Sequence, residues 1–201
     1  MIRSIGYLTN LMKRMLPACA MLVMLGSAQS QAEAGATGMI VCNQPYALCT
    51  SAPCVPMPGD PAKAVCNCTV ENGPSLGTQA CPTLAPSTDA RGVRTIYSTF
   101  SFKQFEAGKK VLTCPGGTPW TLCLNKVCTV DPADPGKAVC TCDVKTDTAA
   151  WVTLGGGCDG GTCKDRYWSG ASVELLNDAS AVLAKAVKLA KAPVNWCPVG
   201  K

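Results

Sequence analysis

Two Cys-x-Cys pairs are the residues of this chain best suited to chemistry. Cys66 and Cys68 form the first pair, and Cys140 and Cys142 form the second. Thiolates at this spacing bind thiophilic metals, whereas oxidised cysteines form structural disulfides. The Cys-x-x-Cys motif of thioredoxin-type proteins does not occur in the chain. The pairs therefore indicate either structural disulfides or a thiol or metal site, and the first interpretation leads.

The chain has no histidine, which removes the commonest general base of enzymes. Ser-His-Asp sites, Cys-His sites and zinc sites with histidine ligands are excluded for the same reason. The carboxylates are scattered, and the two that recur, Asp60 and Asp134, lie in proline-flanked turns where aspartate is favoured by the backbone. We predict no catalytic residue, no cofactor and no metal ligand, and we expect a protein that is not an enzyme.

The sequence around each Cys-x-Cys pair occurs twice. Residues 60–70 return as residues 134–144, at an offset of 74 residues, and a further cysteine precedes each pair by twelve residues. An internal repeat of this kind predicts two similar structural units. We place cysteine-rich repeat 1 at residues 35–107 and repeat 2 at 108–176, followed by a C-terminal helix and tail at 177–201.

Residues 1–34 have the features of a secretory signal peptide. A basic segment precedes a short apolar run, Met15–Leu25, which is too short to span a bilayer. A lipoprotein signal ending at Cys19 is the alternative, but the apolar run continues past that cysteine. We expect an exported protein, periplasmic or extracellular. The candidate cleavage positions are Ala28, Ala32 and Ala34.

Fourteen cysteines remain after the signal peptide, and in an oxidising compartment they predict disulfides. Each repeat holds six, so the simplest pairing has three bonds within each repeat, with bridges between the repeats as the alternative. Cys163 and Cys197 have no counterpart and predict a seventh bond. The expected hairpin also permits a cross-strand bond from Cys54 to Cys66. The predicted disulfide cysteines are Cys42, Cys49, Cys54, Cys66, Cys68, Cys81, Cys114, Cys123, Cys128, Cys140, Cys142, Cys158, Cys163 and Cys197.

The charge of the remaining chain is mildly positive, with fifteen basic and twelve acidic residues. No cluster of lysine or arginine is interleaved with aromatic residues, so nothing indicates a nucleic-acid partner. No further stretch reaches transmembrane length, and we expect no membrane span after the signal peptide.

The elements that must position the cysteines are β-hairpins. Residues 63–70 and 137–144 are the expected second strands, each after a turn rich in proline and aspartate at 57–61 or 131–135. Strand alternation puts both cysteines of a Cys-x-Cys pair on one face.

The rest of the chain adds a strand, a linker and a helix. Residues 94–102 alternate and predict a strand, and residues 103–110 predict a linker between the repeats in which 106–110 are exposed. A helix is expected from Asn177 or Asp178 to about Lys191. We therefore predict a small, disulfide-rich, mainly β fold of two tandem cysteine-stapled repeats with β-hairpins plus a C-terminal α-helix.

Three functions remain open at this point. The first is a non-enzymatic binding or structural protein whose partner, an unknown protein or surface ligand, contacts the hairpin tips at 56–61 and 131–135. The second is a secreted protease inhibitor that uses Lys63 or Lys137 beside a cysteine-constrained loop. The third is a periplasmic thiol or metal-binding protein that uses the Cys-x-Cys pairs.

Overall fold

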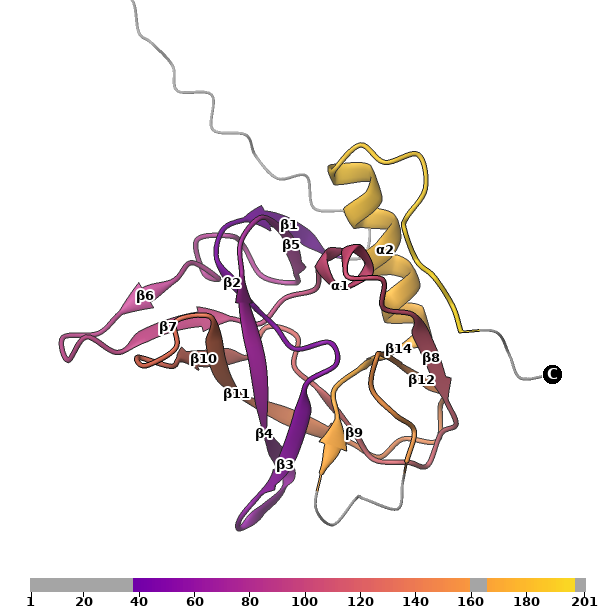
Figure 1. Ribbon diagram of the computed structural model, residues 1–201, viewed down its shortest axis with the longest axis horizontal. Coiled ribbons are helices and arrows are strands. Elements are labelled where there is room, and N and C mark those ends of the chain that lie inside the picture. The colour runs from indigo at the N-terminus through magenta and orange to yellow at the C-terminus, as the bar shows by residue number, and fades with distance from the viewer. Residues whose placement is uncertain (1–37, 160–165, 198–201) are drawn as a thin grey trace, which may run out of the picture. The chain divides into compact units, whose positions relative to one another are not determined.

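The computed structural model describes residues 38–159 and 166–197. Short strands and two helices make up these residues (Figure 1). The predicted signal peptide lies outside these residues. The strands are β1 (Ile40–Asn43), β2 (Tyr46–Leu48), β3 (Pro53–Met57), β4 (Asp60–Glu71), β5 (Pro74–Gly77), β6 (Ser87–Thr88), β7 (Arg94–Tyr97), β8 (Val111–Cys114), β9 (Trp120–Leu122), β10 (Val127–Val130), β11 (Lys137–Lys145), β12 (Trp151–Leu154), β13 (Tyr167–Trp168) and β14 (Ala171–Ser172). The helices are α1 (Lys103–Glu106) and α2 (Val173–Ala186). The mainly β class with a C-terminal helix is thus confirmed.

The largest sheet is built around β4 and β11, which carry the two Cys-x-Cys pairs. They pair antiparallel, and the register places Cys66 opposite Cys140, its own counterpart at the 74-residue offset. Val65 lies opposite Thr141, which is the counterpart of Asn67. Asn67 in turn lies opposite Val139, which is the counterpart of Val65. The pairing is therefore unchanged when the two strands are exchanged, so a local twofold relation passes between Cys66 and Cys140.

The neighbouring strands keep the same relation. β3 pairs with β4 as β10 pairs with β11, and β2 and β9 pair with the far ends of β4 and β11. The edge strands are exchanged: β7 of the first half (38–107) joins β10 of the second half (108–197), and β13 of the second half joins β3 of the first. The two halves thus share one sheet, in the order β13-β3-β4-β11-β10-β7-β6.

The period of two along these strands separates a buried face from an exposed one. The cysteines of β3, β4, β10 and β11 point to the inner face and are buried, together with Ala64, Ile96 and Ala138. The side chains between them point outward. This confirms that each Cys-x-Cys pair lies on one face of its strand, because residues two apart in a strand share a face.

β7 covers only the first part of the strand predicted at 94–102. The chain continues as single bridges, from Ser98 to Ala47 and from Phe100 to Leu76. It leaves the large sheet at this point and reaches the small sheet of β1 and β5. The predicted strand is therefore too long.

α1 lies at the start of the predicted linker. Phe105 of this one-turn helix is buried in a cluster with Leu154 of β12 and Leu176 of α2. The start of the linker thus packs on the protein, because the aromatic ring covers an apolar surface. The residues that follow, 106–110, are exposed as predicted.

α2 begins and ends earlier than the predicted helix. Ser172 caps it, since its hydroxyl oxygen accepts a hydrogen bond of 3.1 Å from the Leu175 N–H. The helix ends at Ala186, and Lys188 takes a left-handed conformation with φ of 57°. Leu183 of the helix is buried, whereas Ala186 is exposed. Among the described residues, no helix is long and apolar enough to cross a membrane.

Candidate functional site

Twelve of the predicted cysteines form six disulfides, and each bond joins two cysteines of the same half of the chain. The connectivity is nested and is the same in both halves, with the first cysteine bonded to the sixth, the second to the fifth and the third to the fourth. The bonds are Cys42–Cys81, Cys49–Cys68 and Cys54–Cys66, then Cys114–Cys158, Cys123–Cys142 and Cys128–Cys140. No bond joins the halves among the described residues.

The predicted seventh bond would join Cys197 to Cys163, which lies outside the described residues. Cys197 itself carries a free thiol. The backbone around Cys197 is held by β8, because the Cys197 N–H donates to the Val111 carbonyl at 2.8 Å. The position of Cys197 thus depends on a backbone contact with a strand far away in the chain, which cysteine counting does not detect.

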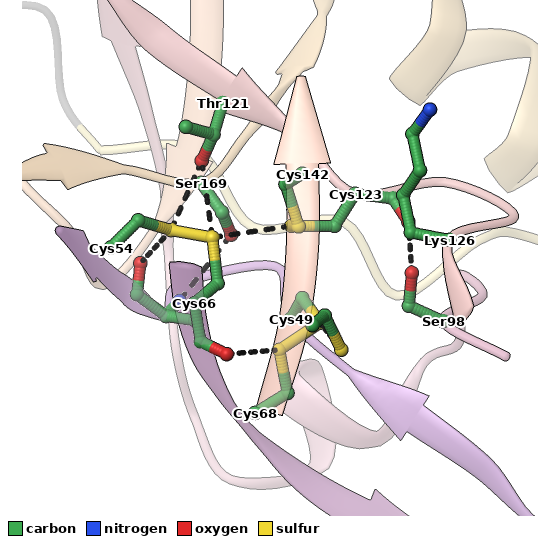
Figure 2. Close-up of a disulfide and its surroundings, with 12 residues drawn as sticks. Cys49, Cys54, Cys66, Cys68, Ser98, Thr121, Cys123, Lys126, Cys142 and Ser169 are labelled. Atoms are coloured by element: carbon green, nitrogen blue, oxygen red, sulfur yellow. Dashed lines mark hydrogen bonds between the residues drawn. A yellow bond between two sulfur atoms is a disulfide. The ribbon is translucent and has the colours of Figure 1, made fainter. Parts of the chain in front are cut away.

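Four of the disulfides pack against one another under the central sheet. Sulfur atoms of neighbouring bonds are 3.4 Å apart between Cys49 and Cys140, and 3.6 Å apart between Cys66 and Cys123. Figure 2 shows Cys54–Cys66 beside Cys123, with the Thr121 hydroxyl 3.1 Å from the Cys54 sulfur. The twofold relation brings these bonds together, because it places the inner face of β4 beside that of β11.

The sulfur cluster does not fit a metal site. Two groups of three sulfur atoms lie within 4.8 Å, but each atom is already in a disulfide. Metal coordination by cysteine requires thiolates. A metal would bind here only after these buried bonds had been reduced.

The hairpin tips do not form one surface. β4 and β11 run antiparallel, so the turn that precedes β4 and the turn that precedes β11 lie at opposite ends of the sheet. Asp60, Asp131 and Asp134 accept backbone hydrogen bonds from residues two positions further on, at 2.8–3.1 Å. These aspartates therefore act as turn formers, and a single small ligand does not contact both tips.

Lys63 and Lys137 are ion-paired residues of the paired strands. Lys63 of β4 lies opposite Asp143 of β11, at 2.5 Å between Nζ and Oδ1, and Lys126 contacts the other carboxylate oxygen at 2.6 Å. Partial burial acts to raise the pKa of Asp143, but hydrogen bonds from Lys126 and Lys63 outweigh it and hold that pKa below its usual value. Lys137 pairs with Asp134, and that hydrogen bond raises the pKa of Lys137.

The outer face of the central sheet exposes apolar side chains. Val55 of β3 is 53% exposed, Val127 of β10 is 52% exposed, Val139 of β11 is 42% exposed and Met57 of β3 is 37% exposed. Val139 lies between buried residues of its strand, and Val55 and Val127 each adjoin a buried cysteine. We call these four residues, on strands β3, β10 and β11, the outer apolar face. Alternation along the strands is the sequence signal for it.

An open groove of about 370 Å³ lies beside the outer apolar face. One wall is formed by α1 and the residues after it, and the other by outward side chains of β4 and the loop that joins β2 to β3. The sequence did not indicate this groove, because its walls are far apart in the chain. It is lined by Leu48, Ser51, Ala52, Pro53, Asn67, Thr69, Glu71, Lys103, Gln104, Ala107 and Lys109.

The groove is polar and carries more positive than negative charge. The Lys109 ammonium donates to the Ser51 hydroxyl at 2.7 Å, and Lys103 pairs with Glu106 at 3.0 Å on the surface of α1. Glu71 is the carboxylate among its lining residues. The groove thus offers ammonium groups, amide groups and hydroxyls.

Comparisons with protein families, with curated proteins and with solved structures give no match to this chain.

Proposed function

We propose that this chain is an exported, non-enzymatic binding protein that recognises a protein partner through the outer apolar face. The observation that carries the proposal is the exposure of Val55, Met57, Val127 and Val139 on one side of a single sheet. Apolar side chains gathered on one surface are typical of a site of protein interaction. Neighbouring positions of the same face are polar, as at the rim of an interface.

The disulfides support this proposal through rigidity. The strands that present the outer apolar face are cross-linked on their inner face by Cys54–Cys66 and Cys128–Cys140. A surface held in one conformation loses little entropy when a partner binds. Six disulfides are also typical of a protein that works in an oxidising compartment, which here is the periplasm or the extracellular space.

The two alternative functions receive less support. An inhibitor of trypsin-like proteases needs a lysine on an exposed loop, whereas Lys63 lies within a paired strand and contacts Asp143. A thiol or metal-binding protein needs free thiolates, whereas Cys66, Cys68 and their counterparts are in disulfides.

The test is capture of a partner from the exported proteins of the source cells. Tagged protein, Val55→Ser/Val139→Ser and Leu189→Ser are compared as baits, and the captured proteins are identified by mass spectrometry. Leu189 is the matched control, since it is 46% exposed but lies beyond the end of α2. We expect one protein to be retained by the wild type and the control and to be lost from the double variant.

Equal capture by all three baits would refute the assignment of the binding surface. Both serine variants keep an exposed position, so circular dichroism is expected to show unchanged folds.

A further inference from the structure

Ala52 in the first half of the chain and Lys126 in the second half occupy equivalent places. The Ala52 N–H donates to the Cys49 carbonyl at 2.9 Å, and the Lys126 N–H donates to the Cys123 carbonyl at 3.1 Å. The Ala52 carbonyl accepts a hydrogen bond from the Ser169 N–H at 3.1 Å. The Lys126 carbonyl accepts one from the Ser98 N–H at 2.9 Å. The two backbones are thus held in the same way, while one side chain is a methyl group and the other a lysine.

Thr69 and Asp143 are equivalent in the same sense. Thr69 lies opposite Leu48 in the pairing of β2 with β4, and Asp143 lies opposite Leu122 in the pairing of β9 with β11. In the second half, the Lys126 side chain reaches Asp143 and closes the space between them with an ion pair. In the first half, alanine and threonine stand at these places, and both line the groove.

The first half therefore has no carboxylate at the place of Asp143, although Glu71 lines the groove, and it keeps one of the two cations that face Asp143. Asp143 lies opposite Lys63 across the sheet, and by the twofold relation Thr69 lies opposite Lys137. Lys103 and Lys109 line the other side of the groove. No described carboxylate forms an ion pair with Lys109, whose ammonium contacts the Ser51 hydroxyl instead. Lys103 and Lys137 have only exposed partners three residues away, Glu106 and Asp134.

We infer that this groove binds an acidic peptide segment, with a carboxylate of the peptide near Thr69, in the place that Asp143 has in the other half. This inference rests on the proposed function and names the chemistry of one part of the partner. Lys103 and Lys109 supply charge-assisted hydrogen bonds to the carboxylates. The exposed Asn67 and Thr69 side chains offer hydrogen bonds to a peptide backbone, and Leu48 and Pro53 offer apolar contact. No aromatic ring is among the lining residues to stack on a sugar.

The experiment measures fluorescence anisotropy of a labelled ten-residue peptide that alternates glutamate and serine, titrated with the protein. A matched peptide has glutamine in place of each glutamate. We expect the protein to bind the acidic peptide and not the glutamine peptide. The affinity should fall as salt is added, because the contacts are between exposed charges. Lys103→Gln/Lys109→Gln should bind about tenfold more weakly.

Two further variants make the test specific. Ala52→Lys/Thr69→Asp installs the ion pair of the second half, so it should fill the groove and abolish peptide binding. Lys110→Gln is the control for the loss of a nearby positive charge, because Lys110 is exposed beside Lys109 but does not line the groove. Equal affinity for the two peptides, no binding by the wild type, or an equal loss in Lys110→Gln and Lys103→Gln/Lys109→Gln would overturn the inference.

The result separates this inference from the proposed function. Val55→Ser/Val139→Ser leaves the groove residues in place and should bind the acidic peptide as the wild type does. If the peptide binds and no partner is captured, the proposed function fails and the groove stands. If a partner is captured by wild type and groove variants alike and the peptide does not bind, only the groove inference fails.

Discussion

At the scale of single residues, Asp143 joins the two halves of the chain through charge. Its carboxylate accepts from Lys63 of β4 and from Lys126, which follows β9. The side chain is 29% exposed, so the interaction is only partly screened by water. Its pKa lies below the usual value, since the two lysine hydrogen bonds outweigh the effect of burial.

Asp143→Asn should lower the free energy of unfolding by about 1 kcal/mol at pH 7, because two partly exposed ion pairs are lost. The folded pKa is lower than the unfolded one, so this contribution is complete above the unfolded value of about 4 and disappears as the pH falls further. Guanidinium unfolding of both proteins between about pH 2 and about pH 7 measures the difference. A difference that stays constant below pH of about 4 would contradict this account. Asp147→Asn, an exposed site, is the control.

Tyr46 is a buried residue whose hydroxyl has a hydrogen-bond partner. Its ring is 1% exposed, and its hydroxyl donates to the Ser101 Oγ at 2.7 Å. Burial raises the pKa of Tyr46 to about 12, and the hydrogen bond to Ser101 lowers it in part. Trp120, the counterpart of Tyr46 in the second half, is also buried and stacks on Trp151 with 5.7 Å between ring centroids.

Absorbance titration at alkaline pH should show one tyrosine that ionises near pH 12. Tyr46→Phe should remove that step and cost about 1 kcal/mol at neutral pH, because one buried hydrogen bond is lost. The folded pKa is raised, so the contribution of Tyr46 is complete below the unfolded value of about 10 and is lost as the pH rises through 12. Tyr97→Phe, at a half-buried position, serves for comparison; a step near pH 12 that survives Tyr46→Phe would refute the assignment.

At the scale of elements, α2 depends on its cap and on one apolar face. The helix follows β14 directly, and Ser172 both ends the strand and caps the helix. Leu176, Ala179 and Leu183 are buried on one side of the helix. Spacing of three and four residues on one face is the pattern that fixes a surface helix to a core.

Ser172→Ala should destabilise the protein by about 1 kcal/mol, because the Leu175 N–H loses its partner. Ser172→Asp should restore the stability, since an aspartate accepts the same bond and suits the positive end of the helix dipole. Guanidinium unfolding followed by circular dichroism measures both variants. Equal stability of the alanine and aspartate variants would show that the cap does not hold the helix.

At the scale of the whole molecule, disulfides and shared strands hold the two halves differently. Each half is closed by three nested bonds of its own, and each bond is typically worth about 2–4 kcal/mol through its effect on the unfolded chain. The halves are joined by the β4–β11 pairing and by exchange of β7 and β13. Disulfides therefore stabilise each half by itself. The two halves are joined to each other by backbone hydrogen bonds between strands and by the packing of their disulfides.

Peptide mapping of the unreduced protein should recover six bonds in the nested order. Cys197 should react with an alkylating reagent before reduction, because its thiol is free and partly exposed. Cys197→Ser should remove that reaction and leave the six bonds unchanged. A peptide that links Cys163 to Cys197 would instead restore the pairing that cysteine counting predicted.

The local features of this fold follow from the sequence. The hairpins, the common face of each Cys-x-Cys pair and the separation of six cysteines into each half depend on residues that are near neighbours in the chain, where alternation and turn chemistry act. The Cys54–Cys66 bond is the simplest case, since a short hairpin alone brings the two cysteines together. The limits of α2 were misplaced because its cap lies in a strand.

Only the tertiary structure decided how the halves combine. The pairing of β4 with β11, the exchanged edge strands and the stack of four disulfides depend on contacts between residues far apart in the chain. The groove has the same origin, because α1, β4 and the loop before β3 meet only in the folded chain. Sequence periodicity states which face of a strand is apolar, but not which distant strand will lie beside it.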